Sequence, residues 1–218
     1  MNPAADNFFV PHTKDPFYRG ALRMVIGGFP RSGTTWVSAT INGLKKGPIA
    51  GHEEPFRFDG FSRDQKSDRV EVSVSGFLTP YLEDLEREGV PVVNLVRNPV
   101  GVVNSCMSFF GGRLWTDYRE DALYVANVWM DWTQKMADYS KYLVRLEDLT
   151  QEPEVLAYVM QREGIELDDG ESGRVAAQAE RRASKPLPDV PLITAKDLPQ
   201  NVLDWAKRLG YTSLEAMK

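Results

Sequence analysis

Short apolar runs alternate along the chain with longer stretches in which apolar residues recur every three or four positions. The runs that predict strands, by β-branched composition or by alternation with period two, are residues 21–29, 47–54, 70–77, 90–99 and 141–149. The stretches that predict helices are residues 33–44, 79–89, 99–110, 119–139, 152–164, 171–183 and 201–209. Strands that alternate with helices in this way predict an α/β fold with a mostly parallel central sheet flanked by helices.

Capping, proline and glycine residues predict where several of these elements begin and end. Thr79 is expected to cap a helix that has Pro80 in its first turn and ends at Gly89. Pro99 is expected to open the helix that follows the most apolar strand. The charged stretch 57–69 predicts an exposed loop.

Composition narrows the class of protein. The formal net charge of −5 is poorly suited to holding a polyanion, so we expect no nucleic-acid partner. The single cysteine, Cys106, excludes an intramolecular disulfide, and its apolar surroundings predict a small core residue. Residues 1–17 lack the features of a signal peptide and no run is long enough to span a membrane, so we expect a soluble, cytoplasmic protein without a membrane partner. The 218 residues predict one domain, with an N-terminal extension over 1–20 and a polar C-terminal segment over 168–218.

The strongest chemical signal lies in residues 25–36, "VIGGFPRSGTTW". A glycine-rich turn between a buried strand and a helix presents backbone N–H groups and the positive end of the helix dipole to an anion. Gly28 and Gly33 have the spacing of a nucleotide-triphosphate loop, but Thr34 occupies the lysine position of that loop and the cation is Arg31. The alternative is an ordinary strand-to-helix turn, for which a single capping Ser or Thr would suffice.

The segment Pro30–Trp36, "PRSGTTW", resembles at every position the 5′-phosphosulfate loop of sulfotransferases that use 3′-phosphoadenosine 5′-phosphosulfate (PAPS). The resemblance implies a three-layer, P-loop NTPase-like α/β fold, with PAPS as co-substrate, adenosine 3′,5′-bisphosphate (PAP) as product and no metal ion. It also implies that Arg31 is catalytic by stabilising charge on the leaving phosphate, since arginine does not give up its proton at neutral pH. The loop residues that it assigns to donor binding are Arg31, Ser32, Gly33, Thr34, Thr35 and Trp36.

A second segment, Leu95–Ser105 ("LVRNPVGVVNS"), resembles the 3′-phosphate motif of the same family. Arg97 stands at the predicted strand end and Ser105 eight residues later on the following helix. A guanidinium fork and a hydroxyl suit a single phosphate, so the resemblance implies that both residues bind the donor. Taken singly, Arg97 is equally compatible with a surface ion pair, and Ser105 with a hydrogen bond to its own helix.

Two later stretches bear on the same site. Residues 142–153 resemble the family's Arg-Tyr-Glu-Asp-Leu strand end, and for Arg145, Glu147 and Asp148 we expect structural roles. The late Arg-Lys-Gly-x-x-Gly-Asp-Trp segment of many cytosolic members has no match, and the basic stretch 181–189 is the only late candidate to replace it. We expect the C-terminal segment to lie over the donor and acceptor sites.

Transfer to an alcohol requires a base that takes the hydroxyl proton. The sequence "GHEEPF" follows the second predicted strand, so its side chains should emerge at the sheet edge that faces the loop. Carbohydrate-type members have a Glu-Pro pair in a comparable position, which favours Glu54 as catalytic base, with His52 and Glu53 as alternatives. The competing interpretation is that Glu53 or Glu54 forms an ion pair with Arg57 or Arg31.

The function predicted from the sequence is transfer of a sulfuryl group from PAPS to a hydroxyl or amine of a small-molecule or carbohydrate acceptor. Trp115, in the loop after the second motif, is the leading candidate for the acceptor pocket. One alternative is a PAP-binding module without catalysis. The other is an ATP-dependent small-molecule kinase, which would require a lysine at position 34 and carboxylates for magnesium.

Overall fold

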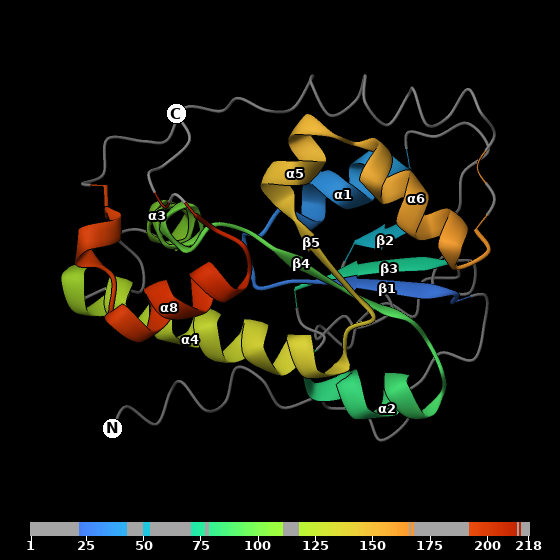
Figure 1. Ribbon diagram of the computed structural model, residues 1–218, viewed down its shortest axis with the longest axis horizontal. Helices are drawn as coiled ribbons and strands as arrows, with labels where there is room; N and C mark the ends of the chain where they lie inside the picture. Colours follow the sequence, from blue (N-terminus) through green and yellow to red (C-terminus); the bar gives the residue numbers. More distant parts are fainter. Residues whose placement is uncertain are drawn as a thin grey trace.

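The computed structural model describes residues 22–42, 50–52, 71–76, 79–110, 118–165, 167, 192–212 and 214. Its centre is a five-stranded sheet in which every pair of neighbouring strands is parallel (Figure 1). The strands are β1 (Met24–Gly27), β2 (Ala50–His52), β3 (Val72–Ser75), β4 (Val92–Val96) and β5 (Tyr142–Arg145), in the spatial order β2-β3-β1-β4-β5. The predicted α/β fold with a parallel sheet is confirmed.

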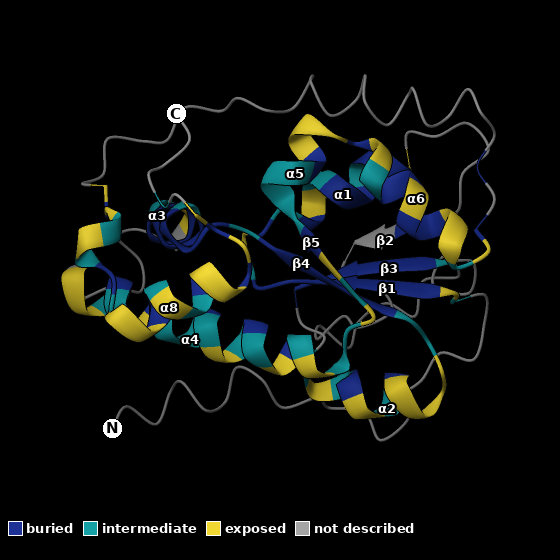
Figure 2. Ribbon diagram, in the orientation of Figure 1, coloured by how far each residue is buried: buried dark blue, intermediate teal, exposed yellow. Residues whose placement is uncertain are grey.

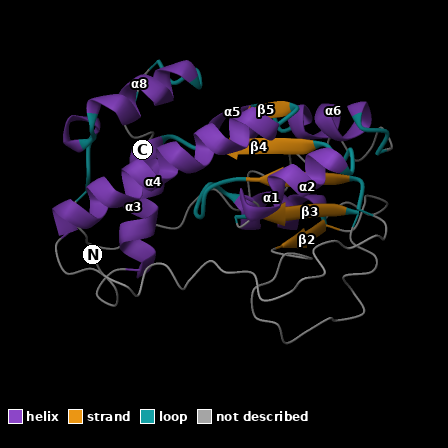
Figure 3. Cartoon of the chain, turned by 90° about the horizontal axis from the view of Figure 1, so that it is seen from below, coloured by secondary structure: helices purple, strands orange, loops and turns teal. Residues whose placement is uncertain are grey.

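Helices cover both faces of the sheet, as expected for a three-layer P-loop NTPase-like fold (Figures 1 and 3). One face carries α1 (Thr34–Ile41), α5 (Leu146–Gln151) and α6 (Glu154–Arg162), and the other carries α2 (Leu82–Arg87) and α4 (Tyr118–Tyr139). Beyond the ends of the strands lie α3 (Pro99–Phe110) and α8 (Gln200–Arg208), and two 3₁₀ turns are η3 (Thr79–Tyr81) and η4 (Ala195–Asp197). Among the described residues, no helix is both long and apolar enough to cross a membrane; α4, with 22 residues, is long enough but too polar.

The three central strands are buried along their whole length (Figure 2). Parallel strands covered on both faces have no solvent side, so their sequences need not alternate. The sequences of β1 and β4 are mostly apolar runs, whereas β3 (VSVS) alternates and buries its serines as well. The edge strand β5 is less covered, and Leu143 is exposed there. Burial on both faces therefore explains the apolar runs that predicted β1 and β4.

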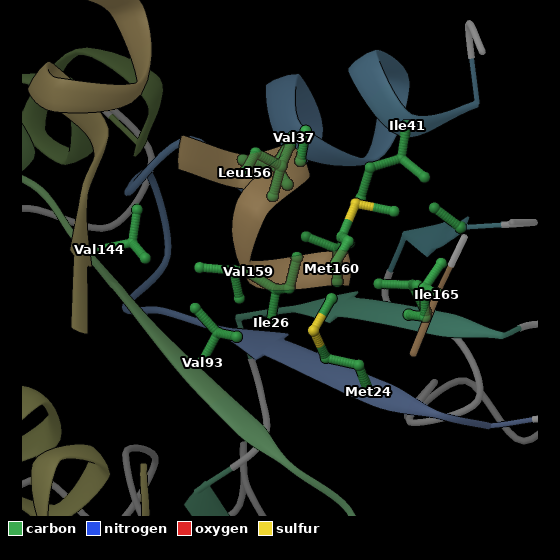
Figure 4. Packing of buried hydrophobic residues seen from close by; sticks show 14 of the residues in the cluster. Met24, Ile26, Val37, Ile41, Val93, Val144, Leu156, Val159, Met160 and Ile165 are labelled. Atoms are coloured by element: carbon green, nitrogen blue, oxygen red, sulfur yellow. The ribbon is translucent and has the colours of Figure 1, made fainter. Parts of the chain in front are cut away.

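Consecutive residues of β1 enter different apolar clusters because side chains alternate across a strand. Met24 and Ile26 pack with residues of α1 and α6 on one face (Figure 4). Val25 packs on the other face with Leu82 and Met136, from α2 and α4. A third cluster, built around Trp129, joins α3, α4 and α8. The sheet is thus fixed from both sides, which holds the loops at its carboxyl edge in place.

The strand order places a topological switch point between β1 and β4. From β1 the chain crosses towards β3 and β2, whereas from β4 it crosses towards β5, so the loops that leave these neighbours diverge. Ligands of open α/β sheets bind in the crevice at such a point. The backbones approach closely there, since a Cβ at Gly28 would lie 2.5 Å from the carbonyl oxygen of Leu95. Only glycine fits that position without moving β4.

Two predicted boundaries were wrong. Residues 146–149 were expected to continue the strand of β5, but they form the start of α5, where Leu146 and Leu149 pack at helical spacing on the core. Thr79 was expected to be the cap of an α-helix, but it begins η3, and α2 starts only at Leu82. The helix predicted for residues 171–183 and the basic stretch 181–189 lie outside the described residues.

Leu156 and Tyr158 of α6 offer a matched test of the core, since Leu156 is buried in the cluster under the helix and Tyr158 is exposed. We expect Leu156→Ala to lower the free energy of unfolding by about 2–5 kcal/mol, because it leaves a cavity. Tyr158→Ala should change it by less than about 0.5 kcal/mol. Urea unfolding of the two variants measures both, and equal losses would contradict the packing described here.

Candidate functional site

The turn from β1 to α1 contains a residue in an unusual backbone conformation. Arg31 has φ 73°, and it is the only non-glycine residue with positive φ among those that the structure describes. The left-handed region costs such a residue about 1–2 kcal/mol, so the surrounding contacts must hold it. The turn is closed by a hydrogen bond of 2.9 Å from the Ser32 N–H to the Phe29 carbonyl oxygen. Ser32 is therefore available to a ligand through its hydroxyl group rather than through its amide.

Arg31 is held by contacts at its backbone and along its side chain. Its carbonyl oxygen accepts a hydrogen bond of 3.0 Å from Nη1 of Arg97, and its Nε donates to Oγ of Ser105 at 3.1 Å. The Arg31 guanidinium carbon lies 4.4 Å from the ring centre of Phe109, in a cation–π contact. Ser105 and Phe109 both belong to α3. The two sequence motifs, which are separated by about sixty residues, are thus joined directly.

Arg97 enters the site from the end of β4 and lies across the first turn of α3. A Cβ at Gly101 would be 3.1 Å from Nε of Arg97, so the glycine makes room for the guanidinium group. Burial lowers the pKa of Arg97, attraction by Glu147 raises it, and repulsion by Arg31 lowers it. Two cations within electrostatic range of each other favour an anion, because an anion placed near both would relieve their repulsion.

The hydroxyl of Ser32 supports the same interpretation. Ser32 is fully buried in the loop, and its Oγ has no hydrogen-bond partner among the described residues. A buried hydroxyl without a partner is unfavourable by about 1–3 kcal/mol, so an acceptor such as a phosphate oxygen would stabilise it. Thr34 is buried and Thr35 exposed at the N-terminus of α1, and both take part in other interactions. Trp36 is half-buried against the core and belongs to the packing of α1.

Cys106 lies beside these groups but is not suited to nucleophilic chemistry. The residue is 3% exposed, and its Sγ is 3.8 Å from the carbonyl oxygen of Pro30. Burial raises the thiol pKa from the ordinary 9.0 to about 12, although Arg31 and Arg97 pull it down. The thiol is therefore protonated at neutral pH, which agrees with the expected role as a small core residue.

The start of α5 contributes more to the site than the sequence indicated. Arg145 and Asp148 form a two-point ion pair, with 2.6 Å from Nε to Oδ2 and 2.8 Å from Nη2 to Oδ1, in keeping with the structural role expected for them. Glu147 instead reaches the second motif, where its Oε1 accepts the N–H of Asn98 at 2.9 Å. Sequence reasoning missed this link, because nothing in the spacing of residues 142–153 shows which acidic side chain turns towards β4.

The candidates for the base are only partly placed. The backbone of His52 ends β2 at the carboxyl edge of the sheet, with β3 between it and β1. Glu53 and Glu54 lie outside the described residues, as do Trp115 and Arg57. The described residues contain no group of three or more His, Cys, Asp or Glu side chains that could hold a metal ion.

Solved structures with the same fold include three sulfotransferases. Mouse sulfotransferase SULT7A1, complexed with PAP, superposes with a TM-score of 0.61 at 14% identity, over 91% of this chain and 84% of that chain. The sulfotransferase domain of the Synechococcus PCC 7002 olefin synthase has a TM-score of 0.56 at 15% identity, over 92% of this chain and 98% of that chain. The sulfotransferase domain from the curacin biosynthetic pathway has 0.53 at 16%, over 89% of this chain and 99% of that chain.

The resemblance to sulfotransferases that the two motifs indicated is thereby confirmed at the level of the fold. Identities of this size establish a shared architecture and leave the reaction to be argued from the site. No protein-family model matches the sequence, and a search of curated proteins also found no match.

The burial and pKa of Cys106 predict slow alkylation. A rise of the thiol pKa from 9.0 to about 12 lowers the thiolate fraction at pH 8 roughly a thousandfold. The native protein should therefore resist alkylation by iodoacetamide at that pH. Mass spectrometry should show labelling of Cys106 only after denaturation. Rapid labelling of the folded protein would mean that the thiol is exposed and ionised.

Proposed function

We propose that the protein transfers a sulfuryl group from PAPS to a hydroxyl or amine of an acceptor and releases PAP. One observation carries the proposal. Arg31 and Arg97, from loops that leave neighbouring strands at the switch point, meet in one hydrogen-bonded unit with Ser105. Two arginines and a serine gathered there suit a ligand with more than one phosphate-like group.

The residues present fit the donor. The 5′-phosphate would lie at the N-terminus of α1, where Ser32 offers its buried hydroxyl and Gly33 occupies the N-cap position. The 3′-phosphate would be bound by Arg97 and Ser105, and this second phosphate distinguishes PAPS from ATP. The donor supplies the sulfuryl group, whose bond to a phosphate oxygen breaks as a bond to the acceptor oxygen or nitrogen forms.

Arg31 has an electrostatic role in this proposal. The electron pair of the broken bond stays on the phosphate oxygen, and a cation near that oxygen stabilises the charge that develops there. Its side chain is already fixed by Ser105 and Phe109, so little reorganisation is required. Because arginine remains protonated, the proton of the acceptor must go to another group.

We propose that Glu54 is the base that removes the hydroxyl proton of the acceptor, with His52 and Glu53 as alternatives. What supports this is the described residue that directly precedes Glu53 and Glu54 in the chain, since the backbone of His52 ends β2 at the carboxyl edge of the same sheet. A carboxylate that takes the hydroxyl proton makes the acceptor oxygen a better nucleophile.

The acceptor is proposed to be a small molecule or carbohydrate with an apolar face. Phe109 is 63% exposed, although its ring lies on the Arg31 guanidinium group. An aromatic surface beside the reactive cation would suit stacking of a ring or of the apolar face of a sugar.

Two alternatives to a sulfotransferase predict different ligand binding or turnover. A PAP-binding module without catalysis would keep Arg31, Arg97 and Ser105 but show no turnover. An ATP-dependent kinase is disfavoured because Thr34 stands at the lysine position of the triphosphate loop.

The donor class is tested by titrating PAP and ADP with Mg²⁺ in a calorimeter. We expect PAP to bind without metal and more tightly than ADP, and Arg97→Ala to weaken PAP by roughly a hundredfold, because a charge-assisted contact to the 3′-phosphate is lost. Arg87→Ala, which removes an exposed arginine of α2 paired with Asp84, is the control. Preference for ADP with Mg²⁺, or indifference to the loss of Arg97, would contradict the proposal.

The base is tested by turnover of PAPS with an acceptor found by screening. Glu54→Gln should lower kcat by about 10²–10⁴-fold and leave the affinity for PAP within twofold, since the base acts on the acceptor. Glu88→Gln, on the exposed end of α2, is the matched control. Loss of turnover in His52→Gln instead would move the role to that residue, and no turnover in the wild type with any acceptor would favour the non-catalytic module.

A further inference from the structure

The segment 192–211 is held by hydrogen bonds to residues of α3 and α4 at separate points. Asn104 of α3 makes two hydrogen bonds with the backbone of Ile193, one of 2.9 Å to its carbonyl oxygen and one of 2.8 Å from its N–H. In α8, the indole N–H of Trp205 donates to Oγ1 of Thr133 in α4 at 2.8 Å. Figure 1 shows α8 in front of α4, and residues of both helices pack in the cluster around Trp129. The segment is thus fixed before it reaches Tyr211.

The end of α8 determines where Tyr211 goes. Gly210 has φ 90°, and its N–H donates to the carbonyl oxygen of Lys207 at 3.0 Å, while the N–H of Tyr211 donates to that of Ala206 at 3.1 Å. This pair of bonds is the Schellman arrangement, which favours glycine at the left-handed position and an apolar contact from the residue after it. Tyr211 is accordingly buried in the cluster that joins α3, α4 and α8.

The hydroxyl of Tyr211 ends against the second motif of the candidate site. It donates to Oε2 of Glu147 at 2.9 Å, and the other carboxylate oxygen, Oε1, accepts the N–H of Asn98, also at 2.9 Å. Asn98 directly follows Arg97 and caps α3, because its Oδ1 accepts the N–H of Val100 at 2.9 Å. One carboxylate therefore connects Tyr211, three residues beyond the end of α8, with the turn that carries Arg97.

Arg145 also contacts Tyr211 and the residue before it. Its guanidinium group is oriented by the ion pair with Asp148 and donates from Nη1 to the Gly210 carbonyl oxygen at 2.5 Å. The guanidinium carbon lies 5.6 Å from the centre of the Tyr211 ring. These contacts leave the ring little freedom to turn its hydroxyl away from Glu147.

Glu147 also attracts Arg97 electrostatically. The two hydrogen bonds from Asn98 and Tyr211 hold the carboxylate in place and share its charge. Glu147 is half-buried and lies within electrostatic range of both Arg145 and Arg97. Arg145 is already held by Asp148 and by the Gly210 carbonyl oxygen, so a carboxylate that lost the Tyr211 donor would draw on Arg97 instead. Arg97 would then turn from the carbonyl oxygen of Arg31 towards Glu147.

We propose that Tyr211 is a positioning residue for the 3′-phosphate site. It acts through Glu147 and the Asn98 backbone on Arg97, so that the stretch after α8 replaces the late donor-site motif absent from this sequence. The inference rests on the proposed function, because it assumes that Arg97 binds the 3′-phosphate.

The test compares PAP with adenosine 5′-monophosphate (AMP), which lacks the 3′-phosphate, by calorimetry on the same protein preparation. Tyr211→Phe should weaken PAP roughly tenfold and leave AMP within twofold, since only the site of Arg97 is disturbed. A merely structural defect would weaken both ligands equally, and a fraction of unfolded protein cancels in the ratio. Tyr142→Phe is the matched control, because Tyr142 donates to Glu163 at 2.5 Å, away from Arg97, and it should leave the ratio unchanged.

A double-mutant cycle completes the experiment. In the background of Arg97→Ala, Tyr211→Phe should have no further effect on PAP affinity, because the group on which Tyr211 acts is gone. A wild type that prefers PAP to AMP, with that preference undiminished in Tyr211→Phe, would overturn this inference alone. A wild type with no preference for PAP over AMP would overturn the proposed function, and the inference with it.

Discussion

The hydrogen bond from Arg97 to the carbonyl oxygen of Arg31 is the contact on which the geometry of the site depends. It ties together two loops that leave neighbouring strands and then diverge. It also keeps Arg31 in a left-handed conformation, from which the side chain reaches Ser105 and Phe109. Because the acceptor is a carbonyl oxygen, the two cations are brought together through a partial negative charge rather than directly.

Charge is distributed unevenly in this protein. The chain as a whole carries a formal charge of −5, yet the loops after β1 and β4 and the start of α5 bring together two arginines and one carboxylate whose oxygens already have donors. Net charge therefore describes the long-range field and says little about a small anion at the switch point. What matters there is that the cations are fixed by neutral partners, so that their charge remains available to a ligand.

The sequence predicted those parts of the fold that follow from local patterns. Buried strands such as β1 and β4, and the helix that Pro99 opens, were located because apolar runs, glycine and proline act over a few residues. The boundary of β5 was missed because Leu146 directly extends the apolar run of the strand, and packing of Leu146 and Leu149 on the same core decided for a helix. Arg31, Arg97 and Ser105 were identified by motif, but their mutual contacts and the partners of Glu147 depend on side-chain directions in three separate elements.

The link between Tyr211 and Glu147 has a consequence for synthesis. Ribosomes add about 5–20 residues per second, so Tyr211 emerges on the order of ten seconds or more after the loop that contains Arg31. During that interval the nascent chain can form the sheet from β1 to β5, while Oε2 of Glu147 lacks the donor that it has in the folded protein. The hydrogen bonds that link Glu147 to the turn carrying Arg97 are therefore completed only when α8 docks, after the sheet has formed.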